Sequence, residues 1–165
     1  MIKKILSGIA FLFLLTPFSP LSAAPEGKII LTISGLITHR NSNGVAQFDL
    51  KALESLGVTT IETHTPWFKG MSWFEGVSLS KLMDTVSAQG KRAKVTALND
   101  YITVIPLTDF FRYNPILAFR RDGKIMGVRD KGPLFIIYPY DKNTELENQI
   151  FYSRSAWQVY RIEIE

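Results

Sequence analysis

Short apolar and β-branched runs recur along the whole chain, and they constrain its fold more than any other feature. Runs of this kind, bounded by turn residues, are typical of β-strands. A tight hairpin turn is predicted at Asp122-Gly123, and another turn at 41–44. The sequence therefore predicts a mostly β core. The runs cover residues 28–37, 59–63, 94–98, 101–105, 116–120, 133–138 and 157–164.

Two segments have helical rather than strand spacing. Asp49 is a favourable N-cap for a helix at 50–56, and Ser78 is the corresponding residue for a helix at 79–88. Both segments repeat apolar residues at intervals of three and four. Residues 64–72 are predicted to form a loop. The expected fold class is α+β, a mixed and mostly β core with a few short helices.

Residues 1–24 have the three parts of a secretory signal peptide. Lys3 and Lys4 form a basic start, an apolar run follows, and 22–24 supply small residues at the cleavage site. The apolar run is shorter than a membrane span requires, although an uncleaved anchor is the alternative. We expect export to the periplasm and a single mature domain over 25–165.

Charge and cysteine content exclude several classes of function. The chain has 19 Lys+Arg and 15 Asp+Glu, and removing Lys3 and Lys4 with the signal leaves 17 against 15. This bias is too small to predict a nucleic-acid partner. The absence of Cys excludes disulfides, iron–sulfur clusters and thiolate metal ligands. His39 and His64 are the only histidines, so a multi-histidine metal site is excluded as well.

Four longer stretches occur in a distinctive order: TPWFKGMSWFEGVSLSKLM (65–83), ALNDYITVIPL (97–107), ILAF (116–119) through RDKGPLFIIYP (129–139), and YSRSAWQVYRIEI (152–164). Together they resemble the oxidoreductase molybdopterin-binding domain, which implies a sulfite-oxidase-type fold. The chain is more closely similar to small exported members that consist of this domain alone. Some of those members are periplasmic pterin-binding proteins that control a membrane diguanylate cyclase.

Two departures from the enzymes of that family bear on the metal. The loop that carries their metal-ligating Cys reads ETHTPW (62–67) here, and a Thr hydroxyl is no substitute for a thiolate at neutral pH. The signal carries Lys3-Lys4, whereas enzymes exported with an inserted cofactor use a twin-arginine signal. The resemblance therefore implies a reduced pterin as ligand, with no molybdenum and no catalysis.

A pterin ring is flat, and its amino-pyrimidinone edge needs hydrogen-bond acceptors. Binding it calls for an aromatic face together with a carboxylate or carbonyl at the edge. We expect the ring to stack on Trp67 or Trp157 and the edge to meet Asp100 or Asp130. The resemblance implies eight ligand-binding residues: Trp67, Asn99, Asp100, Tyr101, Asp130, Gly132, Arg154 and Trp157.

Each of these residues also has a structural interpretation. The two indoles could be packing residues, 99–101 could be a β-turn, and 129–132 could be a solvated charge cluster. Gly132 would allow close backbone approach, and Arg154 either meets the ligand or braces a loop acid. Trp73 is expected in the core. Structural roles are favoured for His64, Tyr138 and Tyr152.

Three functions remain open at this point. The favoured one is a non-catalytic periplasmic protein that senses a reduced pterin and regulates a membrane signalling partner, such as a diguanylate cyclase, through its periplasmic region. The alternative is a molybdopterin-dependent oxidoreductase with a non-Cys metal ligand. The third is an interaction module that has lost the ligand.

Overall fold

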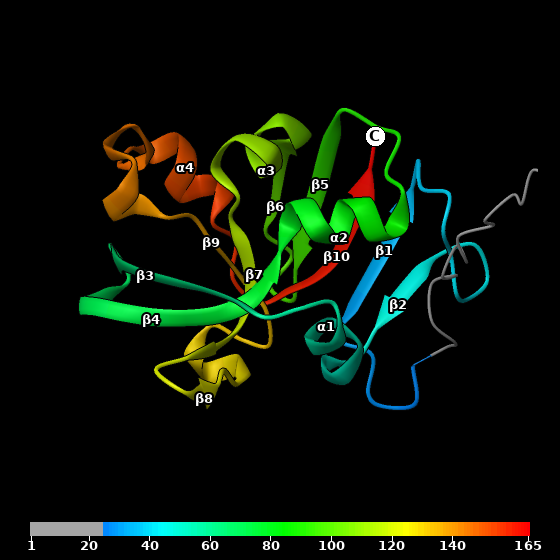
Figure 1. Cartoon of the computed structure of the whole chain (residues 1–165), viewed down its shortest axis with the longest axis horizontal. Helices are drawn as coiled ribbons and strands as arrows, with labels where there is room; N and C mark the ends of the chain where they lie inside the picture. The colour runs from blue at the N-terminus through cyan, green and yellow to red at the C-terminus, as the bar shows by residue number, and fades with distance from the viewer. Residues whose placement is uncertain (1–24) are drawn as a thin grey trace, which may run out of the picture.

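Two β-sheets form the framework of the chain in its computed structural model, which describes residues 25–165 (Figure 1). The signal peptide expected at 1–24 lies outside the described residues. The first sheet has the order β2-β1-β10-β5-β6, and the second β3-β4-β7-β8, with β9 also on β7. The strands are β1 (Leu31–Gly35), β2 (Ala46–Phe48), β3 (Thr59–Thr65), β4 (Phe68–Ser78), β5 (Arg92–Ala97), β6 (Ile102–Pro106), β7 (Ile116–Arg121), β8 (Lys124–Ile125), β9 (Phe135–Ile137) and β10 (Val159–Ile164).

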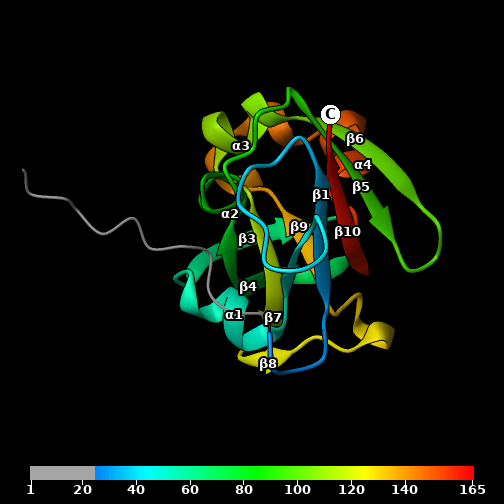
Figure 2. The same ribbon diagram turned by 90° about the vertical axis from the view of Figure 1, so that its right-hand side faces the viewer.

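Within the sheets, only the pairing of β1 with β10 is parallel among the described strands. Figure 2 shows these two strands side by side, with β5 and β6 continuing the sheet beyond β10. The predicted turn at Asp122-Gly123 is confirmed, because it joins β7 to β8 with both residues at positive φ. Such a conformation matches the twist of the flanking strands.

Short helices connect the strands. They are α1 (Leu50–Ser55), α2 (Leu79–Val86), α3 (Leu107–Tyr113) and α4 (Gln149–Arg154), with 3₁₀ turns η1 (Val128–Asp130), η2 (Tyr140–Lys142) and η3 (Thr144–Leu146). Both predicted helices are confirmed with their caps: Asp49 accepts the Ala52 amide at 2.7 Å, and Ser78 accepts the Lys81 amide at 3.4 Å. The predicted mixed, mostly β fold class is also confirmed.

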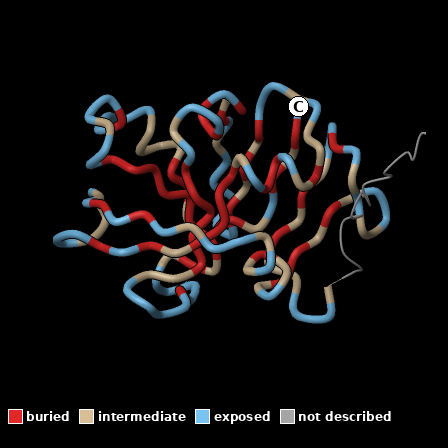
Figure 3. Tube along the Cα trace, viewed as in Figure 1, coloured by how far each residue is buried: buried red, intermediate tan, exposed pale blue. Residues whose placement is uncertain are grey.

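In the second sheet, β9 and most of β7 are buried on both faces, whereas the strands of the first sheet bury only one face. On β7, Ile116 and Ala118 face a smaller apolar cluster, while Leu117 and Phe119 face the main core between the sheets. On β1, Leu31 and Ile33 are buried and the alternate residues are not. Figure 3 shows the resulting concentration of buried chain at the centre of the molecule. No helix among the described residues is long and apolar enough to cross a membrane.

The prediction of a loop at 64–72 is wrong, because strands occupy most of this stretch. Strands β3 and β4 form a long hairpin whose turn is Pro66 and Trp67, with a register shift at His64/Thr65. Trp73, expected in the core, is 51% exposed, because strand alternation buries Phe74 and turns Trp73 to the solvent. The turn-forming residues in this stretch, including a Gly70 at positive φ, concealed the strand.

Candidate functional site

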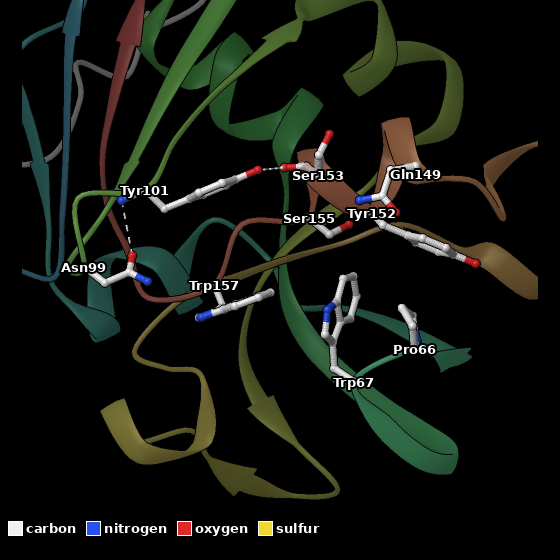
Figure 4. A pocket seen from close by; sticks show the side chains of 9 residues that line it. All are labelled: Pro66, Trp67, Asn99, Tyr101, Gln149, Tyr152, Ser153, Ser155 and Trp157. Carbon is white, nitrogen blue, oxygen red and sulfur yellow. Dashed lines mark hydrogen bonds between the residues drawn. The ribbon is translucent and has the colours of Figure 1, made fainter.

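A pocket of about 320 Å³ opens where four segments distant in sequence meet. They are the β3–β4 turn, the β5–β6 turn, helix α4 and the segment that leads into β10 (Figure 4). The volume is in the range of small-molecule sites. The lining residues, which we call the aromatic pocket, are Pro66, Trp67, Asn99, Tyr101, Gln149, Tyr152, Ser153, Ser155 and Trp157.

Two aromatic rings face each other across this pocket. Figure 4 shows Tyr101 on one side of the hollow and Trp157 on the other. The Tyr101 hydroxyl donates to the carbonyl of Ser153 at 2.8 Å, which ties the β5–β6 turn to α4. The pocket is therefore a hollow between two flat rings, a shape suited to a planar ligand.

Trp67 forms a rigid wall of the pocket. Its indole meets Phe135 at a centroid distance of 5.2 Å and Trp157 at 6.0 Å, both edge-on. It also meets Tyr152 at 6.0 Å and packs against both apolar clusters. Edge-on packing on several sides fixes the ring orientation, so the wall is in place before any ligand arrives.

Trp157 is supported from behind by the segment around η1. A β-bridge joins it to Phe135, and the next amide, that of Gln158, donates to the Lys131 carbonyl at 3.0 Å. The Lys131 ammonium lies 4.0 Å from the centroid of the Trp157 ring. Burial lowers the pKa of Lys131 below its ordinary value.

The polar groups in the pocket carry no charge. The Ser155 hydroxyl is buried, donates to the Phe151 carbonyl at 3.1 Å and lies 2.5 Å from the Tyr140 hydroxyl. Burial raises the pKa of Tyr140, so this tyrosine stays neutral at all ordinary pH values. Asn99 and Gln149 add two amide side chains, and no Asp, Glu, Lys or Arg of the described residues 25–165 lines the pocket.

Four of the eight predicted site residues are brought together here: Trp67, Asn99, Tyr101 and Trp157. Neither predicted carboxylate lines the pocket. Asp100 is exposed at φ +64°, and its amide donates to the Ala97 carbonyl at 3.0 Å, which closes a turn over 97–100. Asn99 and Asp100 therefore also have the turn role of the structural interpretation. Asp130 is exposed in η1.

Gly132 and Arg154 serve the scaffold. A Cβ at Gly132 would collide with the Met126 carbonyl. The close backbone approach that this glycine allows is therefore to Met126 of the same chain. Arg154 donates to Asp109 at 2.7 Å, and the Tyr138 hydroxyl donates to the same oxygen at 3.1 Å. Burial, and next the Asp109 carboxylate, raise the pKa of Tyr138. Arg154 therefore forms an ion pair with an acidic side chain of the scaffold, in agreement with its structural interpretation.

The lining residues that the sequence did not single out come mostly from α4. Gln149, Ser153 and Ser155 belong to this helix or follow it directly, and Pro66 precedes Trp67 in the hairpin turn. Asn148 caps α4 by accepting the Ile150 amide at 2.9 Å. An Asn before a short apolar stretch was the available signal.

The stretch 62–67, which the resemblance places at the Cys-bearing loop of the molybdopterin enzymes, offers oxygen and imidazole groups only. The Thr63 hydroxyl accepts the Asp141 amide at 3.1 Å, and the His64 ring nitrogen lies 2.8 Å from the Asp141 carboxylate. Burial alone would raise the pKa of Asp141, but the hydrogen bonds from His64 lower it. The Thr65 hydroxyl is buried without a partner. A single neutral hydroxyl is a poor ligand for the metal of a molybdopterin, so these residues do not fit that group.

No three His, Asp or Glu side chains within 25–165 lie close enough together to hold a metal ion. No family model matches the chain, and a search of curated proteins finds no match either.

Proposed function

We propose that the aromatic pocket binds a neutral planar heterocycle, and that this ligand is a reduced pterin. The observation that carries the proposal is the uncharged hollow between Tyr101 and Trp157, closed at one end by Trp67. Stacking on an aromatic ring favours a flat ligand. A site without charged side chains favours a ligand without charge, because an unpaired charge placed there would lose its hydration.

The pterin edge would be recognised by amides rather than carboxylates. The side chains of Asn99 and Gln149 each donate and accept hydrogen bonds, which suits an edge that presents both kinds of group. Asn99 already accepts the Tyr101 amide at 3.3 Å through its oxygen, and its amino group remains available for a ligand carbonyl. This assignment replaces Asp100 and Asp130 in the edge-binding role.

The wider role follows from the resemblance rather than from the pocket. We propose a sulfite-oxidase-type fold exported to the periplasm, with the pterin-bound form acting without catalysis on the periplasmic region of a membrane signalling protein such as a diguanylate cyclase. Molybdenum content, measured on protein purified from the periplasm, separates this role from that of a molybdopterin-dependent oxidoreductase. A content near one metal per chain would contradict the proposal.

Calorimetric titration of 6-methyltetrahydropterin under anaerobic conditions tests the pocket. Trp157→Ala should weaken binding about 10- to 100-fold, because stacking of a base-like ring contributes about 1–3 kcal/mol. Asn99→Ala should weaken it about 3- to 10-fold through one lost hydrogen bond. Trp73→Ala, which removes an exposed indole, is the matched control. Equal binding by the folded Trp157 and Asn99 variants and the control would show that the ligand site lies elsewhere.

A further inference from the structure

Lys131 contacts the ring of Trp157 without lining the pocket. Its ammonium is 4.0 Å from the indole centroid, yet Lys131 is not among the residues that line the pocket, while Trp157 is. An indole ring has two faces, and an ammonium that covers one of them outside the pocket leaves the other for the pocket; we infer this arrangement for Trp157. Trp157 thus stands between a cation and the ligand site.

The position of this lysine is built into the fold. The backbone at Lys131 is left-handed, with φ +69°, and its carbonyl accepts the Gln158 amide at 3.0 Å. The Gln158 side chain also donates to the Val128 carbonyl at 2.8 Å. None of the ion pairs within 25–165 includes Lys131. The ammonium therefore contacts the indole, and no carboxylate within 25–165 forms an ion pair with it.

A cation on one face of an aromatic ring changes what the other face attracts. The ammonium is held by the negative quadrupole of the ring and draws π-electron density toward itself. The pocket face of Trp157 becomes less negative, so it should attract an electron-rich ring more strongly and a cationic ring less. Burial of Lys131 strengthens this effect because less water screens the charge.

We propose that Lys131 is a specificity-determining residue of the aromatic pocket, one that favours electron-rich, reduced rings over oxidised or cationic rings of the same size. The inference rests on the proposed ligand site and adds the redox and charge preference of that site. Lys131 acts through Trp157 and does not touch the ligand.

Three bicyclic probes test this preference: 6-methyltetrahydropterin, its oxidised counterpart 6-methylpterin, and the cation N-methylquinolinium. Each is titrated into wild type, Lys131→Met, which retains most of the aliphatic stem, and Lys131→Arg, which retains the cation. We expect Lys131→Met to reduce the preference for the reduced over the oxidised pterin about 3- to 10-fold. We also expect it to bind N-methylquinolinium more tightly than wild type does.

Rescue by Lys131→Arg separates an electrostatic role from a merely structural one. The arginine variant should retain the wild-type ratio of affinities to within about twofold, since a guanidinium also stacks over an indole. An unchanged ratio in folded Lys131→Met would overturn the role of Lys131 and leave the pterin site standing. Failure of wild type to bind any of the three probes would overturn both proposals.

Discussion

Helix α4 separates two regions with opposite chemistry. At its end, Arg154 reaches the carboxylate of Asp109, where side chains only 22% and 10% exposed form an ion pair. Along the same helix, Gln149 and Ser153 line a pocket without any charged side chain. The one charged residue of α4 pairs with an acid of the scaffold, and neutral residues of the same helix line the aromatic pocket.

The difference shows that a charged residue expected at the ligand from a family resemblance need not line the pocket. Arg154 was expected at the ligand, yet its guanidinium is satisfied by Asp109. A partly buried charge without a partner is strongly unfavourable, so each member of the pair requires the other, and their pairing keeps the Arg154 charge out of the pocket. The predictions below test this separation of scaffold charges from ligand contacts.

Asp109→Ala should have the largest effect on stability. It leaves Arg154 without its carboxylate and the Tyr138 hydroxyl without an acceptor. We expect the free energy of unfolding to fall by about 3 kcal/mol, measured by urea denaturation. The remaining folded protein should bind 6-methyltetrahydropterin as wild type does. A loss of binding larger than the loss of folded protein would show that the ion pair is coupled to the pocket.

Trp67→Ala should affect both regions. Its indole packs against the two apolar clusters and forms a wall of the pocket. We expect about 2–3 kcal/mol lower stability, together with weaker probe binding in the calorimeter. Trp73→Ala in the same hairpin is the control and should change stability by less than about 0.5 kcal/mol. Similar effects of the two substitutions would contradict the exposure of Trp73.

Asp49 is a scaffold carboxylate whose contribution should depend on pH. Hydrogen bonds from the amides of Ala52 and then Gly27 lower the pKa of Asp49 in the folded state. Its stabilising contribution is therefore present above the pKa of the unfolded chain and is lost as the pH falls through the lower, folded value. Urea midpoints of wild type should fall toward those of Asp49→Asn as the pH is lowered from about 6 to about 3. A constant difference over this range would contradict the prediction.

Asp100→Ala and Asp130→Ala should have the smallest effects. Both side chains are exposed and outside the pocket. We expect less than about a twofold change in affinity for 6-methyltetrahydropterin, because neither substitution removes a group that meets the ligand. A tenfold loss in either variant would return a carboxylate to the site and remove the distinction between the two regions.

Local signals in the sequence predicted local structure well. Asp49 and Ser78 cap the helices that they were expected to cap, and Asp122-Gly123 forms its hairpin turn. Strand β4 could not be predicted in the same way, because its burial alternation begins only after turn-like residues such as Gly70.

The candidate site was half predictable, and the reason lies in sequence distance. Trp67, Tyr101 and Trp157 could be predicted because their residue type alone suggests a role in stacking, and all three line the pocket. The partner of a charged residue cannot be identified from its type alone, and Asp109 and Arg154 are 45 positions apart in the sequence. Only the folded chain shows that this arginine is already engaged.

Strand β10 has a consequence for the order of events during folding. It lies between β1 and β5, although β1 is the first strand of the described chain and β10 the last. Pairings between such distant segments form slowly, because a long loop must close before they gain any contact. Until β10 (residues 159–164) is in place, β1 and β5 each have one edge without a partner strand. Trp157, two residues before β10, reaches its position beside Phe135 together with that strand. A newly made chain therefore remains accessible to chaperones and proteases until β10 docks, and its aromatic pocket is among the last features to form.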